Sequence, residues 1–498
     1  MRRSGILLPV SSLPSQYGIG CFSKEAYEFV DFLALAGQSY WQVLPMGPTG
    51  YGDSPYQSFS TFAGNPYFVD LEEFIAKKWL SKKDCESIDW GSEQSTVDYE
   101  KIYNNRFKLL RKAYLKSGIE DDKDFIKFEK DNSSWLDDYA LFMALKEHFK
   151  GKSFNQWPED LKKHKKTAVK ELLSSPAYHD KVMCYKFIQY FFFKQWISLK
   201  KYANEKGVEI IGDIPLYVAR DSADTWSHPE LFKFDKNNDP TGVAGCPPDY
   251  FSATGQLWGN PLYDWEHIKK TGYKWWIERL KTCFELYDVV RIDHFRGFDE
   301  YYNIPFGDPT AEFGHWEKGP GYDFFKVVKE KLGDRKIIAE DLGFLTPSVF
   351  RLVKKTGFPG MKILEFAFDS GEDNNYLPHN YDKNCVVYTG THDNDTAVGW
   401  FEKAGKKDRK FAMDYMGIKN GKQFGWELIR LAQRSVADTV VIPMQDYLEL
   451  GSEGRINTPS TLGGNWAWRM SAGADTAELA ARIKQLSELY GRFLLRHV

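Results

Sequence analysis

Short apolar or β-branched runs alternate along the chain with longer stretches in which apolar residues recur at helical spacing. Eight short runs are candidates for parallel strands, at residues 6–9, 41–45, 209–215, 288–293, 336–340, 362–366, 385–389 and 439–443. Apolar stripes typical of helices occur between several of them, at residues 24–36, 183–205, 274–287, 322–332, 348–355 and 426–437. Strand and helix repeated eight times predict an α/β fold, a closed (β/α)8 TIM barrel spanning residues 1–498.

The spacing of the strands is uneven, which indicates inserted subdomains. Far more chain separates the second run from the third than the ~30 residues of one βα unit. Residues 71–177 are rich in Lys, Glu, Asp and Leu and predict a mainly helical insertion. Residues 220–272 are rich in Gly, Pro, Asn and Trp and predict an ordered loop insertion after the third strand. Residues 476–495 predict a closing helix with Asp475 as its N-cap, and no chain is left for a C-terminal β-sandwich domain.

Charge and cysteine usage narrow the functional classes. Lys and Arg number 66 against 69 Asp and Glu, without long runs of one sign, so we expect no nucleic-acid or membrane partner. The first apolar run is short and broken by Pro9, and no ~20-residue apolar stretch follows, which favours a cytoplasmic protein. Six separated cysteines form no C-x-x-C pair, so no zinc or redox motif is expected. Aromatic residues make up 16% of the chain, and most should lie in the core, although sugar rings also stack on such side chains.

Acidic residues occupy the positions where barrel enzymes carry their chemistry. Catalytic groups of such barrels lie at the carboxyl ends of the strands. Asp213, Asp293, Glu340 and Asp393 lie near the carboxyl ends of the third, fourth, fifth and seventh runs. One such acid alone would more often be a helix cap or a solvated charge. Four of them would converge on one mouth, which favours an active site.

Two of these acids fit a retaining glycosidase pair. Arg291 lies two residues before Asp293, on the same strand face, and can hold that carboxylate ionised. Glu340 follows an apolar run that can raise its pKa and keep it protonated, although Asp341 is an alternative acid. An ionised nucleophile beside a protonated acid is the requirement of retaining chemistry. His392 and Asp393 could bind sugar hydroxyls in addition.

The sequence around these residues resembles a known family. RIDHFRG, AEDLG and THDND occur together with WQVLPMGPTGYGDSPYQSFSTFAGNP, GCPPDYFSATGQLWGNPLYDW and NTPSTLGGNWAWR. Over nearly the whole chain these blocks resemble the α-amylase clan, and more closely the amylomaltases, the 4-α-glucanotransferases of glycoside hydrolase family 77. Val218 and Arg296-Gly297 stand where ordinary α-amylases carry His and Lys-His, and amylomaltases share both differences.

The resemblance implies roles for individual residues. Asp293 would be the nucleophile, Glu340 the acid/base and Asp393 the stabiliser of the transition state. The expected substrate-binding residues are Ser54, Tyr56, Asp213, Asp249, Phe251, Gln256, Trp258, Arg291, His294, His392 and Asn465. The insertion at 220–272 would cover the cleft and bind the acceptor chain. The substrates would be α-1,4-glucans and maltooligosaccharides, with no cofactor, no metal and no obligatory protein partner.

Two rival hypotheses come from the same residues. A glucan hydrolase on this fold would share the covalent intermediate and differ only in its acceptor. A glucan-binding scaffold without turnover is the second rival hypothesis. Such a scaffold would not require Asp293, Glu340 and Asp393 at the ends of their strands.

Overall fold

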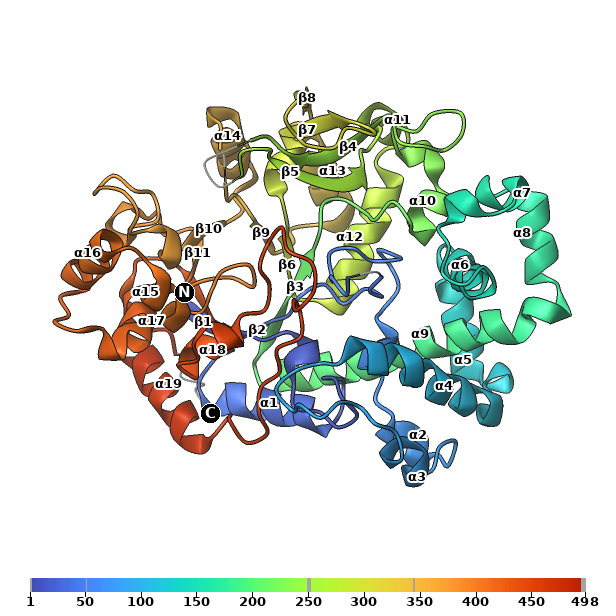
Figure 1. Ribbon diagram of the computed structural model, residues 1–498, viewed down its shortest axis with the longest axis horizontal. Helices are drawn as coiled ribbons and strands as arrows, with labels where there is room; N and C mark the ends of the chain where they lie inside the picture. The colour runs from blue at the N-terminus through green and yellow to red at the C-terminus, as the bar shows by residue number, and fades with distance from the viewer. Residues whose placement is uncertain (1, 51, 249–251, 344, 494–498) are drawn as a thin grey trace.

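The computed structural model describes residues 2–50, 52–248, 252–343 and 345–493. Eight parallel strands lie in the order β10-β11-β12-β1-β2-β3-β6-β9 and curl into a nearly closed barrel (Figure 1). Each strand overlaps one predicted run, so the prediction of a (β/α)8 barrel is confirmed. The strands are β1 (Arg3–Leu7), β2 (Tyr40–Gln42), β3 (Glu209–Ile214), β6 (Val289–Ile292), β9 (Ile337–Ala339), β10 (Gly360–Ile363), β11 (Cys385–Tyr388) and β12 (Thr439–Pro443).

The seam between β9 and β10 is closed partly by a side chain. The Ala339 N–H donates to the Pro359 carbonyl over 3.0 Å. One step further along, the Met361 N–H donates to Asp341 Oδ1 over 2.7 Å. A Cβ atom on Gly360 would lie 2.3 Å from the Asp341 carboxylate, so only glycine fits beside it. Asp341 is therefore a structural element of the barrel wall.

The barrel interior follows the two-residue period of the strands. Ile211 and Val289 are buried in an apolar cluster inside the barrel. Asp213 and Arg291 lie two residues beyond them and therefore point to the same side. The apolar side chains of Ile211 and Val289 thus lie one layer deeper in the barrel than the charged groups of Asp213 and Arg291.

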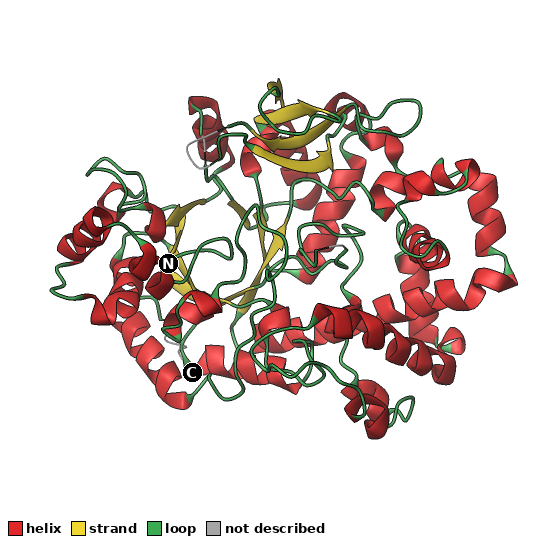
Figure 2. Ribbon diagram, viewed as in Figure 1, coloured by secondary structure: helices red, strands yellow, loops and turns green. Residues whose placement is uncertain are grey.

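Helices surround the strands, as Figure 2 shows. The outer helices are α1 (Lys24–Leu35), α9 (Pro176–Glu205), α12 (Lys274–Leu286), α13 (Gly321–Leu332), α14 (Pro347–Thr356), α15 (Ala397–Lys403), α16 (Lys406–Met416), α17 (Phe424–Arg434), α18 (Met444–Tyr447) and α19 (Ala477–Leu489).

The prediction of Asp475 as the N-cap of the last helix was wrong. Thr476 is extended and accepts from the Leu479 N–H, because it directly precedes the first helical residue. No helix in the described ranges is long and apolar enough to cross a membrane.

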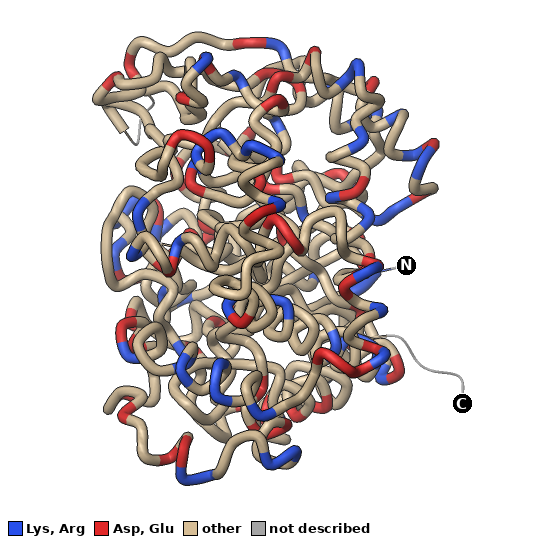
Figure 3. The backbone as a smooth tube through the Cα atoms, turned by 90° about the vertical axis from the view of Figure 1, so that its right-hand side faces the viewer, with Lys and Arg blue, Asp and Glu red and all other residues tan. Residues whose placement is uncertain are grey.

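Further helices lie between β2 and α9, on the right in Figure 1. They are α2 (Glu72–Ala76), α3 (Lys82–Glu86), α4 (Tyr99–Ser117), α5 (Lys123–Asp131), α6 (Leu136–His148), α7 (Glu159–Lys162) and α8 (Lys166–Leu173). Basic and acidic residues are interspersed along the face that Figure 3 presents. The assignment of residues 71–177 as a separate insertion stays a prediction.

The segment after β3 contains strands that the sequence did not indicate. β4 (Gly242–Cys246) and β5 (Gln256–Pro261) join β7 (Glu300–Pro305) and β8 (His315–Lys318) in an antiparallel sheet of order β5-β4-β7-β8. Helices α10 (Ala223–Ser227) and α11 (Trp265–Lys270) flank the two strands. The prediction of a loop over residues 220–272 was therefore wrong here. The sequence did not indicate these strands because both are short and contain glycine or proline, which strands usually avoid, and because β4 pairs with β7 outside the segment.

The barrel seam yields a test of stability. Asp341→Ala leaves the buried Met361 N–H without its acceptor, so we expect the free energy of unfolding to fall by about 1 to 3 kcal/mol. Asp341→Asn keeps an oxygen acceptor and should remain within about 1 kcal/mol of the parent. Urea unfolding at pH 7 measures both variants. Equal stability of the alanine variant and the parent would contradict a closing role for this carboxylate.

Candidate active site

Arg291 lies between two carboxylates at the ends of β3 and β6. The strand register pairs Asp213 with Arg291. Arg291 Nη1 donates to both oxygens of Asp213 over 2.7 Å, and it lies 3.0 Å from Asp293 Oδ1. The Tyr56 hydroxyl donates to Asp213 Oδ2 over 2.8 Å. Asp213 is fully buried and Arg291 is 3% exposed. Burial would lower the pKa of Arg291, but Asp213 and Asp293 outweigh it and raise that pKa.

Glu340 is held beside Asp293 by main-chain donors. The His294 N–H donates to Glu340 Oε2 over 2.7 Å, and the Leu342 N–H donates to Oε1 over 2.8 Å. His294 has a left-handed backbone with φ of 52°, directly after Asp293. The bonded N–H belongs to the residue next to Asp293, and the Asp293 charge raises the pKa of Glu340, so the two carboxyl groups lie close enough to interact.

The pKa values of this pair differ in the order that a nucleophile and an acid require. Burial raises the pKa of Asp293 to about 6 and outweighs the opposite effect of Arg291. Burial and the neighbouring Asp293 charge raise the pKa of Glu340 to about 7. The predicted influence of Arg291 is present, but it does not lower the pKa of Asp293 below its ordinary value. At neutral pH the proton resides preferentially on Glu340.

Asp341, the alternative acid, is engaged elsewhere. Burial raises the pKa of its carboxyl to about 6. However, its Oδ1 accepts from Met361 across the barrel seam. The geometry therefore favours Glu340 as the proton donor.

Asp393 has a different electrostatic environment. Burial would raise its pKa, but His392 and Asn457 outweigh it and lower that pKa to about 2. Asn457 Nδ2 donates to Asp393 Oδ1 over 2.6 Å, and His392 Nε2 lies 3.4 Å from Oδ2. The side chain of Asp393 is 48% exposed, so it remains available to a ligand.

Aromatic rings hold His392 in place. Tyr56 stacks on the His392 ring with centroids 5.1 Å apart and an interplanar angle of 22°. Trp466 contacts the His392 ring, with centroids 5.9 Å apart, and also contacts the ring of Tyr56. The histidine is thus oriented by packing on its apolar surfaces and by Asp393 at its edge.

The strand β5 brings two predicted acceptor residues to the site. The Trp258 indole N–H donates to Gln256 Oε1 over 3.0 Å. The edge of Trp258 meets the ring of His294, with centroids 4.7 Å apart and an interplanar angle of 89°. Burial and Arg296 lower the pKa of His294 to about 3, so this histidine is neutral. Its Nε2 is buried and has no hydrogen-bond partner among the described residues.

Two other predicted residues, Ser54 and Asn465, form hydrogen bonds within their own loops. The Ser54 hydroxyl accepts from the Tyr56 N–H over 3.3 Å and so supports its own turn. Asn465 accepts from the Thr458 N–H over 2.9 Å and donates to Thr461, which fastens the loop at 458–465. Asp249 and Phe251 lie outside the described residues.

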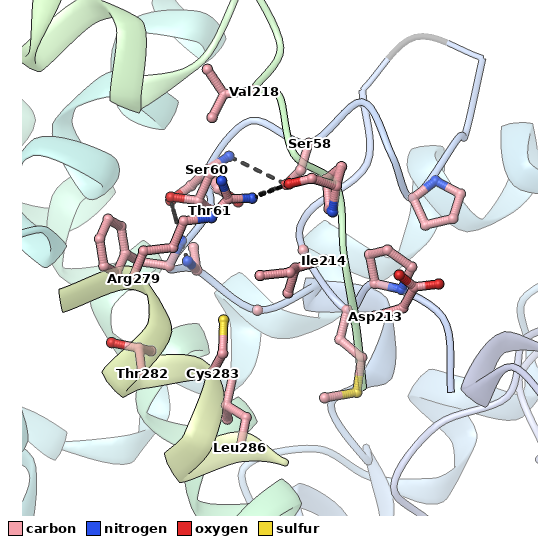
Figure 4. A pocket seen from close by; sticks show the side chains of 18 of the residues that line it. Ser58, Ser60, Thr61, Asp213, Ile214, Val218, Arg279, Thr282, Cys283 and Leu286 are labelled. Carbon is pink, nitrogen blue, oxygen red and sulfur yellow. Dashed lines mark hydrogen bonds between the residues drawn. The ribbon is translucent and has the colours of Figure 1, made fainter. Parts of the chain in front are cut away.

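A pocket of about 600 Å³, counted with the solvent at its mouth, adjoins Asp213 (Figure 4). Ser58, Ser60 and Thr61 line one side, and Cys283 of α12 lines another. Arg279 of α12 donates to the carbonyl of Pro215 over 2.5 Å and to that of Leu216 over 3.1 Å. This buried guanidinium group thereby holds the chain that follows Asp213.

Sequence reasoning missed several residues that position the predicted ones. Asn457 and Arg455 both bind Asp393, the latter through an Nη2 donation to the Asp393 carbonyl over 2.7 Å. Trp466 packs on His392. Asn457 and Trp466 stand inside the NTPSTLGGNWAWR block, so the block was a signal, but it did not indicate which of its residues contact the site.

Comparison with known proteins shows similarity to a single protein family along nearly the whole chain. The profile of the family described as 4-alpha-glucanotransferase matches residues 8–475. The 4-alpha-glucanotransferase of Clostridium butyricum is 52% identical, and the alignment covers 97% of this chain and 99% of that protein. That of Streptococcus pneumoniae is 50% identical, with 99% and 97% covered. The amylomaltase from Streptococcus agalactiae in complex with acarbose superposes with a TM-score of 0.96 at 40% identity, covering 99% and 100%.

The paired carboxyl groups predict a pH profile. A reaction that needs ionised Asp293 and protonated Glu340 should show a bell-shaped kcat/KM with maltotriose, limited by apparent pKa values near 6 and 7. Asp213 raises the pKa of Asp293. Asp213→Asn removes that negative charge, so the pKa of Asp293 should fall and the acidic limb should move to lower pH.

The matched control is Asp341→Asn, which also exchanges a carboxylate for an amide at the mouth of the barrel. It should leave the acidic limb in place, because the charge of Asp341 is not among the causes that shift the pKa of Asp293. An acidic limb that stays fixed in Asp213→Asn, or moves to higher pH, would contradict the coupling of Asp213 to Asp293.

Proposed function

The chain belongs to the 4-alpha-glucanotransferase family, glycoside hydrolase family 77, and we propose that Asp293, Glu340 and Asp393 perform its reaction. The enzyme is a 4-α-glucanotransferase that moves a segment of an α-1,4-glucan to the 4-hydroxyl of another glucan or of glucose. The observation that carries the assignment of roles is the geometry of the pair: the Arg291 guanidinium lies 3.0 Å from Asp293, and the His294 N–H holds Glu340 over 2.7 Å. A carboxylate beside a protonated carboxyl is the arrangement of retaining chemistry.

In the first step, a carboxylate oxygen of Asp293 attacks the anomeric carbon of the donor sugar. The bond from that carbon to the glycosidic oxygen breaks, and this oxygen takes the proton of Glu340 and leaves with the reducing-end fragment. The result is a β-linked glucosyl ester on Asp293 and an ionised Glu340. The Arg291 guanidinium, 3.0 Å from Asp293, stabilises the carboxylate before the attack.

In the second step, Glu340 removes the proton from the 4-hydroxyl of an incoming chain. The hydroxyl oxygen attacks the anomeric carbon, and the ester bond to Asp293 breaks. Two inversions restore the α-linkage, and both carboxyl groups return to their starting protonation states.

Asp393 and His392 are proposed to act on the sugar ring itself. Asp393 is ionised and half-exposed, and His392 is locked by Tyr56 and Trp466. A fixed negative charge beside the ring stabilises the positive charge that develops at the anomeric carbon. Asp213 and Tyr56 would bind hydroxyl groups of the same sugar.

The acceptor side rests on β5 and its neighbours. Gln256 and Trp258 form one hydrogen-bonded unit against the neutral His294. We propose that this surface, with Asp249 and Phe251 of the adjoining segment, binds the acceptor chain and limits access of water. Transfer exceeds hydrolysis only when a positioned hydroxyl competes with ~55 M water, so pre-organisation of the acceptor is required.

A cytoplasmic location is part of the proposal. Among the described residues, Cys21, Cys85, Cys184, Cys283 and Cys385 are buried and form no disulfide, which fits a reducing compartment. The proposed substrates are maltooligosaccharides and longer α-1,4-glucans.

The acid role of Glu340 can be tested with two donors. Glu340→Gln should lower kcat/KM for maltotriose by about 10² to 10⁴-fold, since the leaving oxygen loses its proton donor. α-Glucosyl fluoride has a leaving group that needs little protonation, so release of fluoride in the first turnover should fall by less than about tenfold. Fluoride-electrode and chromatographic assays measure the two reactions. Equal loss with both donors would argue against an acid role, and Asp341→Asn serves as the matched control.

The nucleophile and the transfer reaction can be tested together. The parent enzyme should convert maltotriose into glucose and a ladder of longer chains, whereas a hydrolase gives only shorter products. Asp293→Ala should lower this conversion by about 10⁴-fold or more, because the covalent step is lost. Thin-layer chromatography and mass spectrometry follow the products. Unchanged conversion by the variant would refute the assignment of Asp293.

A further inference from the structure

The loop that carries His392 and Asp393 is buried at both ends and exposed in the middle. It connects β11 to α15 and runs from Thr389 to Ala397, two residues that are fully buried. The Asp393 side chain between them is 48% exposed. Its position therefore depends on how the two ends are anchored.

One carboxylate binds both ends of this loop. Asp446 Oδ2 accepts from the Thr389 hydroxyl over 2.5 Å. Its other oxygen, Oδ1, accepts from the Ala397 N–H over 2.8 Å. Asp446 is 1% exposed and lies in α18, directly after the last barrel strand. A buried carboxylate with one donor on each oxygen fixes the separation of the two donors.

The chain that follows Asp446 contacts the middle of the same loop. Ser452 Oγ donates to Asp395 Oδ2 over 2.8 Å. Arg455 and Asn457 donate to the carbonyl and the carboxylate of Asp393. The Asn457 N–H donates to the His392 carbonyl over 3.1 Å. Residues 446–457 thus hold the loop at its two ends through Asp446 and in its middle through the other three side chains.

We propose that Asp446 is a positioning residue for the transfer reaction, because it clamps the two ends of the 389–397 loop and thereby fixes Asp393 against the sugar ring. The inference rests on the role proposed above for Asp393. Asp446 itself contacts only the protein, and its effect reaches the substrate through Asp393. A displacement of about 1 Å at such a group can cost about 10²-fold in rate.

Three substitutions distinguish the effect of losing the clamp on the 389–397 loop from the effect of a general loss of stability. Asp446→Ala removes both bonds and should lower kcat for maltotriose by about 10 to 100-fold, with KM changed by less than about threefold. Asp446→Asn should recover most of this loss, because the amide oxygen can accept from Ala397 and the amide N–H can donate to the Thr389 hydroxyl. Thr476→Ala removes the N-cap of α19 far along the chain. It should lower the melting temperature by a few degrees and leave kcat unchanged.

A double-mutant cycle with Asp393→Asn distinguishes an effect of Asp446 that acts through Asp393 from an effect that is independent of it. If Asp446 acts through Asp393, then Asp446→Ala should change the rate of fluoride release from α-glucosyl fluoride by less than about twofold in the Asp393→Asn background. An equal factor in both backgrounds would overturn the inference and leave the role of Asp393 intact. An Asp393→Asn enzyme as fast as the parent would instead refute the role of Asp393.

Thr389→Val provides the test if Asp446→Ala does not fold. It keeps the volume of the side chain and the Asp446 carboxylate and removes only the bond at the start of the loop. We expect about 3 to 10-fold lower kcat in the parent background and no further loss beside Asp393→Asn. A Thr389→Val enzyme with unchanged kcat would overturn the clamp.

Discussion

The buried guanidinium group of Arg291 determines how the rest of the site is organised. A cation enclosed in protein is costly unless anions accompany it, and here both Asp213 and Asp293 contact Nη1 of Arg291. This arrangement requires β3 and β6 to keep their register, since Asp213 and Arg291 are paired across it. One guanidinium group cannot balance three neighbouring carboxylates, so the simultaneous ionisation of Asp213, Asp293 and Glu340 is unfavourable. The proton therefore stays on Glu340, because burial and the Asp293 charge raise its pKa to about 7.

The barrel makes this charge arrangement possible because it supplies fixed strand ends from distant parts of the chain. Its closure involves Asp341, which bonds across the seam next to Glu340 and so links barrel integrity to the placement of the acid. The helix α12 adds Arg279, which binds the carbonyls after Asp213. The carboxyl ends of the strands are thus held in place by the buried side chains of Asp341 and Arg279.

The strands and the acidic strand ends could be predicted because both depend on local sequence. Each apolar run is long enough to be recognised, and an acid lies near its carboxyl end: Asp213, Asp293 and Glu340 at the end itself and Asp393 a few residues beyond it. The sheet formed by β4, β5, β7 and β8 could not be predicted, since its strands gain their stability from pairing with a remote segment. The same reason applies to Asn457, Arg455 and Asp446. Their side chains are ordinary polar groups in the sequence, and only the fold brings them to the 389–397 loop.

The three carboxylates of the mouth acquire different properties from their surroundings alone. Asp293 has a buried cation beside it, Glu340 has main-chain donors and an acidic neighbour, and Asp393 has a histidine and an asparagine. These environments separate their pKa values to about 6, 7 and 2. Separation of this kind lets chemically similar groups act as nucleophile, acid and permanent anion in one site. Because the same charges would serve hydrolysis equally well, the proposed acceptor surface around Trp258 and His294 is where we expect the preference for a sugar acceptor over water to arise.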